Sequence, residues 1–356
     1  MLLLEYGTAG PESLAENRVL AAGGCRDEPW NLRDVIVAPA TADFMARAAH
    51  GHADDLLTAC LLANTAPVLL VPAMNDRMWA NAQTARNAAH LRGLGYAVIE
   101  PDTGPLAVGE GSGPGRMPEP ESIIAHASRL LEKTGALTGR KVVVTAGATR
   151  EAIDPVRFIS NHSSGRMGVA IAEAAWRRGA DVTLIAGHLD VPVPAPVKRV
   201  DVDSTAAMKD AVANAVASAD ALVMAAAPAD YRPSNVSSSK LKKGRSGSDR
   251  SQTIDLVNTG DILQSTAQVR KSGCVVVGFA LETEDLLINA RSKLERKSLD
   301  MIVANSAVEE GAGFGSDTNR VTFIHKAGGT EDIPLMAKTQ LADAILDRVE
   351  SLLDGR

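Results

Sequence analysis

The stretch Lys141-Val-Val-Val-Thr-Ala-Gly, residues 141–147, decides the fold class of this chain. Three consecutive valines that lead into a glycine turn are typical of a short strand buried on both faces of a sheet. Residues 164–178 follow, with apolar side chains at helical spacing, and stop at Gly179. Residues 181–187 then form a second short apolar run. Strand, helix and strand in this order predict a parallel sheet with helices on its faces.

The same alternation continues in both directions along the chain. Toward the N-terminus, apolar runs begin at Val35, Pro67 and Tyr96, and helical patterns cover residues 42–50, 53–64 and 77–94. Toward the C-terminus, Ser204 is placed to cap a helix, and apolar runs begin at Ala221, Val275 and Met301. We therefore predict an α/β protein with two tandem domains, each a mostly parallel sheet with helices on both faces, flavodoxin-like or Rossmann-like.

The boundary between the two domains is indicated by a change in composition. Residues 102–120 are rich in glycine and proline, and residues 133–139 read as an exposed linker. We place the boundary near Gly135, which predicts one domain at residues 1–135 and a second at residues 136–356.

Composition excludes several classes of protein. With 45% hydrophobic and 22% charged residues among 356, the chain can bury a sizeable core and is not disordered. A net charge of −6 and only 3% aromatic residues argue against a nucleic-acid partner. No apolar stretch is long enough for a membrane span, the first residues lack the features of a signal peptide, and the three cysteines share no CxxC spacing. We expect a cytoplasmic protein with small-molecule substrates and neither nucleic acid nor membrane as a partner.

One motif in the second half is suited to binding phosphate. Asn161-His-Ser-Ser-Gly-Arg-Met-Gly lies at a predicted helix start, where free backbone N–H groups and a partial positive charge favour anions. The motif is neither the phosphate loop G-x-x-x-x-G-K-[ST] nor G-x-G-x-x-G. An ordinary capped turn between a strand and a helix uses the same residues, so both interpretations stay open.

Further segments carry charged or small polar residues that allow a functional or an ordinary explanation. Lys240-Leu-Lys-Lys lies in a Ser/Gly/Lys-rich stretch, residues 234–252, that predicts a mobile loop, and its lysines could neutralise a polyphosphate or be a solvated linker. Lys293 and Lys297 are predicted to share one helical face, and such a pair is more often solvent-exposed than ligand-binding. Phe279 is more often a core side chain than a ring that stacks on a base. In the first half, two successive strands end in small polar segments, Ala38-Pro-Ala-Thr-Ala and Pro72-Ala-Met-Asn. These segments could line a shared binding crevice, or they could be ordinary turns between a strand and a helix.

Taken together, the motifs resemble those of a known family of two-domain enzymes. The first half is similar to the flavin-dependent phosphopantothenoylcysteine decarboxylase module through Ala38-Pro-Ala-Thr-Ala, Gly51-His-Ala-Asp-Asp-Leu-Leu, Pro72-Ala-Met-Asn and Gly113-Pro-Gly-Arg-Met. The second half is similar to the phosphopantothenate–cysteine ligase module through Asp154-Pro-Val-Arg-Phe-Ile-Ser-Asn-His-Ser-Ser-Gly, Ala229-Asp-Tyr-Arg, Lys240-Leu-Lys-Lys, Gly278-Phe-Ala-Leu-Glu-Thr and Gly313-Phe-Gly-Ser-Asp. The resemblance extends from residue 34 to about residue 350, in the order found in the bifunctional bacterial enzyme of coenzyme A synthesis.

For the second half, the resemblance implies a CTP-dependent ligase. The carboxylate of 4′-phosphopantothenate attacks the α-phosphate of CTP with the help of Mg²⁺, and the amine of cysteine then displaces CMP from the acyl-cytidylate. The resemblance assigns catalysis to Asn161, Arg157 and Lys240. It assigns CTP binding to Met224, Ala225, Ala226, Asp230, Thr259, Gly260, Asp261, Ile262, Phe279, Lys293 and Lys297. The segment Thr259-Gly-Asp-Ile departs mildly from the Asn-Pro-Asp-Ile of many relatives.

For the first half, the resemblance implies FMN bound by Ala38, Pro39, Ala40 and Thr41, and substrate bound by Asn75 and Arg116. The chain departs from the family here, because no Gly-rich turn precedes Ala38, no histidine precedes His50, and Val108 stands at the position of the flap cysteine. We therefore expect an N-terminally truncated and impaired decarboxylase.

The resemblance also implies a homo-oligomer, with a dimer of ligase domains and a trimer or larger shell of decarboxylase domains. Three alternatives stay open: the full bifunctional enzyme, a flavin or nicotinamide oxidoreductase, and a first half that serves only for assembly. The lack of G-x-G-x-x-G and of a Gly-rich flavin segment counts against the oxidoreductase.

Overall fold

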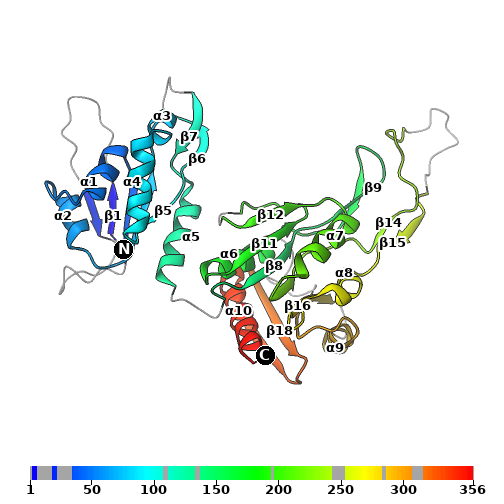
Figure 1. Ribbon diagram of the computed structural model, residues 1–356. Helices are drawn as coiled ribbons and strands as arrows, with labels where there is room; N and C mark the ends of the chain where they lie inside the picture. The colour runs from blue at the N-terminus through cyan, green and yellow to red at the C-terminus, as the bar shows by residue number, and fades with distance from the viewer. Residues whose placement is uncertain are drawn as a thin grey trace. The chain divides into compact units, whose positions relative to one another are not determined.

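The computed structural model describes residues 2–5, 18–21, 34–106, 111–132, 137–193, 196–242, 253–282, 286–306 and 316–355. The chain divides into two compact units, residues 1–133 and 134–356 (Figure 1). The predicted boundary residue, Gly135, lies outside the described residues.

The first unit is built on a five-stranded sheet in the order β2-β1-β3-β4-β5, which is parallel except between β1 and β2. Its strands are β1 (Leu2–Glu5), β2 (Arg18–Ala21), β3 (Val35–Ala40), β4 (Val68–Pro72) and β5 (Ala97–Val98). Its helices are α1 (Ala42–Ala49), α2 (Leu56–Ala63), α3 (Asp76–Trp79), α4 (Ala82–Gly93) and α5 (Pro120–Leu131). Val35 and Val37 pack toward α1, α2 and α4, whereas Ile36 packs toward α5, so helices cover both faces as predicted.

Two local features of the first unit differ from the sequence prediction. The single helix predicted over residues 77–94 is two helices, α3 and α4, because the Asn81 side chain accepts a hydrogen bond from the Gln83 N–H at 2.8 Å and caps α4. The Gly/Pro-rich stretch contains an antiparallel hairpin of β6 (Asp102–Pro105) and β7 (Ser112–Arg116) that the sequence did not indicate.

The second unit is built on an eight-stranded sheet in the order β12-β11-β8-β13-β16-β17-β18-β19. Its strands are β8 (Lys141–Ala146), β11 (Asp181–Ala186), β12 (Lys198–Asp201), β13 (Ala221–Met224), β16 (Val275–Glu282), β17 (Met301–Ser306), β18 (Thr318–His325) and β19 (Thr330–Ala337). The strands from β12 to β17 are parallel, and β18 and β19 are antiparallel additions at one edge. The direction in which successive strands are added reverses between β8 and β13.

Helices cover both faces of this second sheet (Figure 1). One face carries α6 (Arg166–Arg177) and α10 (Lys338–Asp354), which pack against each other. The other face carries α7 (Thr205–Val216), α8 (Ile262–Ser265) and α9 (Leu286–Arg296). The short 3₁₀ turn Ala267–Val269 follows α8. Ser204 caps α7 as predicted, since its hydroxyl accepts from the Ala207 N–H at 3.2 Å.

Two short antiparallel ribbons that the sequence did not indicate lie side by side in the second unit (Figure 1). The first pairs β9 (Arg150–Ala152) with β10 (Phe158–Ser160), and the second pairs β14 (Tyr231–Pro233) with β15 (Leu256–Asn258). Of the predicted mobile loop, residues 234–242 are described and residues 243–252 lie outside the described part. Within the described part of the chain, no helix is both long and apolar enough to cross a membrane.

Candidate active site

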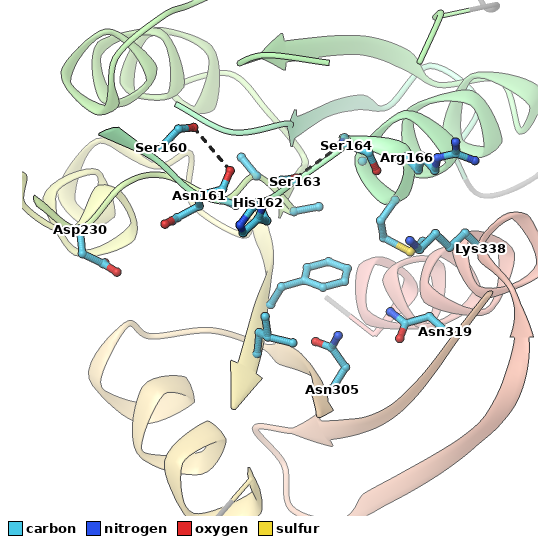
Figure 2. A pocket seen from close by; sticks show the side chains of 18 residues that line it. Ser160, Asn161, His162, Ser163, Ser164, Arg166, Asp230, Asn305, Asn319 and Lys338 are labelled. Carbon is cyan, nitrogen blue, oxygen red and sulfur yellow. Dashed lines mark hydrogen bonds between the residues drawn. The ribbon is translucent and has the colours of Figure 1, made fainter. Parts of the chain in front are cut away.

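A cavity of about 550 Å³ opens beside the point where the strand order of the second sheet reverses (Figure 2). In open α/β sheets, this reversal at the carboxyl ends of the strands creates the crevice that binds ligands. The described residues that line the cavity are Ser160, Asn161, His162, Ser163, Ser164, Gly165, Arg166, Met167, Gly168, Ala225, Ala226, Ala227, Asp230, Phe279, Leu281, Asn305, Asn319 and Lys338.

Glycines bring the N-terminus of α6 close to the end of β8. Gly165 precedes the helix with φ +77°, a left-handed conformation that side chains disfavour. A Cβ on Gly168 would lie 2.5 Å from the Ala146 Cβ, so only glycine lets the first helical turn pack directly on the strand. Residues 165–168 at the start of α6 line the cavity, and the free backbone N–H groups of a helix N-terminus suit an anion.

Asn161 is held at the cavity wall by its own side chain. Its Nδ2 donates to the backbone carbonyl of Pro228 at 2.9 Å, and the neighbouring Ser160 hydroxyl donates to the Thr149 carbonyl at 2.7 Å. The first bond joins the segment before α6 to the turn that follows β13, and the second joins it to the turn that follows β8, so the predicted catalytic amide has a defined orientation.

Three threonine hydroxyls, of which those of Thr149 and Thr205 are buried, fix the turn that carries Asp230. The Ala229 N–H donates to the Thr149 hydroxyl at 2.8 Å, and the Ala229 carbonyl accepts from Thr205 at 3.2 Å and from Thr259 at 2.7 Å. Ala229 itself is buried, so these bonds satisfy its backbone groups where water cannot reach them. Thr259 was predicted to bind CTP, but its hydroxyl serves this internal network.

The predicted CTP-binding residues fall into two groups. Ala225, Ala226, Asp230 and Phe279 line the cavity together with Asn161. Outside its lining lie Met224, Thr259, Gly260, Asp261, Ile262, Lys293 and Lys297. Met224 and Ile262 are only 5% and 4% exposed, and their side chains pack into the hydrophobic core, because the alternation along a strand turns Met224 away from the cavity.

Asp261 and Lys297 form an ion pair with the lysine Nζ 2.8 Å from the carboxylate Oδ2. Burial opposes the charge on Asp261, but the hydrogen bonds from Lys297 and from the Gln264 N–H hold the pKa of this carboxyl below its usual value. Lys293 is half-buried on α9, but α9 ends at Arg296 and Lys297 lies in the turn that follows, so only Lys293 of the predicted pair is on the helix.

Arg157 and Lys240, the other predicted catalytic residues, also lie outside the cavity lining. The Arg157 guanidinium donates to the backbone carbonyl of Leu241, which is the neighbour of the exposed Lys240. The buried Asp154 carboxylate accepts from the Leu241 N–H at 3.1 Å and from the N–H groups of Val156 and Arg157 at 2.8 and 2.9 Å. Asp154 thus ties Leu241, the residue that follows Lys240, to the turn that holds Arg157.

Asp154→Asn should loosen this segment while keeping the local turn. An asparagine oxygen can still accept from Val156 and Arg157, but its NH₂ group cannot accept from the Leu241 N–H. We expect amide hydrogen exchange at residues 237–242 to become about tenfold faster, the value of one lost hydrogen bond. Asp255→Asn, at the exposed residue just before β15, is the matched control, and unchanged exchange in the Asp154 variant would contradict the tether.

The pH dependence of this tether follows from the charge on Asp154. Burial works against ionisation, but the backbone N–H donors of Val156, Leu241 and Arg157 outweigh it and hold the pKa of Asp154 below its usual value. A lowered pKa in the folded state means that the tether is fully present above the unfolded-state value of about 3.9, and is lost as the pH falls through the lower folded-state value.

Several lining residues were not predicted individually from the sequence. His162, Ser163, Ser164 and Arg166 belong to the phosphate-type motif, so the signal for them was present. Asn305 ends the apolar run of β17, and a polar residue at a strand end was the available clue. Asn319 and Lys338 lie on β18 and α10, where no motif marks them.

In the first unit, the predicted flavin and substrate residues lie at two neighbouring strand ends. The Ala38–Pro39 peptide bond is cis, and the Thr41 hydroxyl caps α1 by accepting from the Phe44 N–H at 3.1 Å. Asn75 caps α3, with its Oδ1 2.9 Å from the Arg77 N.

The hairpin β6–β7 brings Arg116 toward the segment that contains Asn75. The Met74 N–H donates to the Gly115 carbonyl at 2.9 Å, and a Cβ on Gly115 would lie 2.2 Å from the Met74 carbonyl oxygen. Arg116 itself pairs with Glu119. Val108, at the expected flap cysteine, lies outside the described residues.

A mostly parallel open sheet with a cavity at its switch point, and a helix N-terminus in the cavity wall, defines an α/β protein with a site suited to an anionic ligand. Residues 137–353 match the family described as the DNA/pantothenate metabolism flavoprotein C-terminal domain, and residues 16–132 match the flavoprotein family. The chain belongs to the family of bifunctional coenzyme A biosynthesis proteins.

Individual relatives agree with this assignment. The coenzyme A biosynthesis bifunctional protein CoaBC of Mycobacterium bovis is 48% identical over 335 residues, which cover 90% of this chain and 79% of the relative. CoaBC of Bacillus subtilis is 44% identical over 321 residues, which cover 89% and 78%. The crystal structure of the C-terminal domain of a CoaBC protein is 36% identical, with a TM-score of 0.53 over 62% of this chain and all of that domain. The chain is thus an enzyme of coenzyme A biosynthesis with domains of the ligase and decarboxylase families.

Proposed function

We propose that the second unit joins 4′-phosphopantothenate to cysteine at the expense of CTP. The observation that carries this proposal is that Asn161, Ala225, Ala226, Asp230 and Phe279, from three separate segments, surround one cavity at the strand-order switch. The resemblance assigns these positions to the acyl-cytidylate and to CTP. The family membership supports the same chemistry.

The proposed reaction has two steps. A carboxylate oxygen of phosphopantothenate attacks the α-phosphorus of CTP, the bond to the bridging oxygen of the β-phosphate breaks, and pyrophosphate leaves with the electron pair. The free amine of cysteine then attacks the activated carbonyl carbon, the bond to the cytidylate oxygen breaks, and the nitrogen loses a proton as CMP leaves. Both steps develop negative charge on phosphate oxygens, so the site has to supply fixed donors and positive charge.

The residues of the second unit divide this work. The N-terminus of α6 would receive phosphate oxygens, and Asn161 would donate to the acyl-cytidylate. Arg157, on the ribbon next to the cavity segment, would offset charge on the intermediate, and Lys240 would approach the phosphates from the segment that Asp154 tethers.

Mg²⁺ fits this site as a companion of the nucleotide. Among the residues that the structure describes, no three His, Cys, Asp or Glu side chains form a metal-binding group. Mg²⁺ usually binds through substrate phosphates and only one or two carboxylates, and Asp230 is the carboxylate in the described lining of the cavity. The metal would neutralise charge on the phosphates, with Asp230 holding it.

A comparison of nucleotides tests the proposed function. With phosphopantothenate and cysteine present, we expect pyrophosphate release with CTP to exceed release with ATP strongly, and amide formation to match it. Equal turnover with both nucleotides would remove the CTP assignment, and no amide with either would remove the ligase proposal.

For the first unit, we propose a decarboxylase-type flavin domain whose activity is impaired. The flavoprotein family match supports FMN, and the strand-end residues Ala38–Thr41, with small side chains and a helix start at α1, would hold it. FMN supplies the oxidation that precedes loss of CO₂. The chain has no histidine among residues 1–49 to act as the base, and Val108 provides no acidic proton.

We also propose that the second unit forms a dimer through its two ribbons, with a trimer or larger shell built by the first unit. Apolar side chains are exposed on the ribbons: Phe158 and Tyr231 are 47% and 53% exposed, and Val156, Leu256 and Val257 are exposed beside them. Exposed apolar surface of this kind marks a contact with another chain. Phe158→Ser with Leu256→Ser should lower the mass measured by sedimentation, whereas the exposed Leu335→Ser should not, and an unchanged mass in the double variant would exclude this interface.

A further inference from the structure

The charged residues around the cavity are distributed unevenly. Figure 2 shows Asp230 across the cavity from Arg166 and Lys338, and Asp230 is the only carboxylate among the described residues that line it. The buried carboxamide of Asn319 lies on the same side as Lys338. One end of the cavity is therefore cationic and carries amide donors.

The two cationic side chains, Arg166 and Lys338, lie at helix N-termini, where positive charge is unfavourable. Arg166 is the first residue of α6 and Lys338 is the first residue of α10, and their N-caps, Gly165 and Ala337, have no side-chain acceptor. The positive end of a helix macrodipole favours an acid in its first turn and repels a cation. Two helices that both begin with a cation at one cavity carry an electrostatic disadvantage that a bound anion would remove.

Within the described part of the chain, the partners of Arg166 and Lys338 do not balance the positive charge of these two side chains. Arg166 pairs with the exposed Asp317, but its Nε is buried and has no hydrogen-bond partner among the described residues. Lys338 donates from Nζ to the Ser316 carbonyl at 2.5 Å, and burial followed by the nearby Arg166 lowers the pKa of Lys338. Arg166 and Lys338 thus share the Asp317 carboxylate, and a further negative group would stabilise the charged form of both side chains.

We propose that Arg166, Lys338 and Asn319 form a subsite for a phosphate group at this end of the cavity. An Arg, a Lys and a carboxamide together supply the multiple N–H donors that phosphate oxygens accept. The source of the phosphate rests on the proposed function, which offers two: the β- and γ-phosphates that leave as pyrophosphate, and the phosphate of phosphopantothenate.

Binding measured without turnover tests this subsite. The full chain and its Lys338→Gln and Arg166→Gln variants are titrated calorimetrically with inorganic pyrophosphate, 4′-phosphopantothenate and unphosphorylated pantothenate. We expect each variant to lose about tenfold or more in affinity for at least one phosphate compound, since a charge-assisted hydrogen bond is lost. Pantothenate affinity should stay unchanged. The exposed Lys326→Gln is the matched control, and Lys338→Arg should retain most of the affinity.

The outcomes separate the sources and the two proposals. A loss for pyrophosphate alone assigns the subsite to the nucleotide, a loss for phosphopantothenate alone assigns it to that substrate, and a loss for both supports a shared anion site. Unchanged affinities in both folded variants, or no binding of either phosphate compound by the unaltered chain, would overturn the subsite. If the unaltered chain failed the CTP assay but the variants still bound pyrophosphate more weakly than it does, the proposed reaction would be wrong and the subsite would be supported.

Discussion

Asn161→Asp should reduce amide formation by about 100-fold or more while the fold stays intact. The aspartate loses the N–H that donates to the Pro228 carbonyl at 2.9 Å and sets a carboxylate against that carbonyl oxygen. It also places negative charge beside the anionic acyl-cytidylate. Two like charges about 4 Å apart repel by about 4 kcal/mol at an effective dielectric constant of about 20, and each 1.36 kcal/mol on the barrier is a factor of ten.

The measurement is the rate of pyrophosphate release and of amide formation at saturating CTP, with circular dichroism to confirm folding. Asn214→Asp is the matched control, because this asparagine is exposed on α7 outside the cavity lining. It should leave the rate unchanged. An Asn161→Asp variant that folds correctly and turns over at the unaltered rate would remove Asn161 from the catalytic residues.

The second large effect concerns the first unit, which should release no CO₂ from phosphopantothenoylcysteine even with added FMN. The resemblance implies a catalytic histidine about a dozen residues before Ala38, and residues 1–49 contain none. The loss of a general base alone typically reduces a rate by about 10²–10⁴-fold. The flap position carries Val108, which cannot protonate the enethiolate product.

The same preparation should still form the amide, and this activity is the internal control for intact protein. Val108→Cys should remain inactive, because the cysteine restores a proton donor but not the base. Substantial CO₂ release by the unaltered chain would show that this half uses other residues.

Local sequence patterns were sufficient to predict the architecture. The apolar runs at Val35, Lys141 and Asp181 became parallel strands, because burial on both faces requires continuous apolar side chains. The patterns could not indicate β9, β10, β14 and β15, since strands of three residues carry too few positions for a period. The break at Ala80 between α3 and α4 was missed because one asparagine cap interrupts an otherwise helical stretch.

The motifs also indicated part of the candidate site. Asn161, Asp230 and Phe279 were singled out from the sequence, and they line the cavity. The turn at Gly165 and Gly168 was recognisable as a possible phosphate-binding helix start, because glycine is the residue that allows such a close approach.

The sequence by itself thus determined the alternation of strands and helices and the residues suited to bind phosphate. Only the tertiary structure decided which of them share a cavity. Lys338 joins Arg166 across more than 170 residues of chain because β18 and β19 are added at the sheet edge and α10 returns to pack on α6. Met224 is excluded because its strand turns that side chain into the core. Both outcomes depend on strand order and on the direction of each side chain, which long-range packing sets and local periodicity does not record.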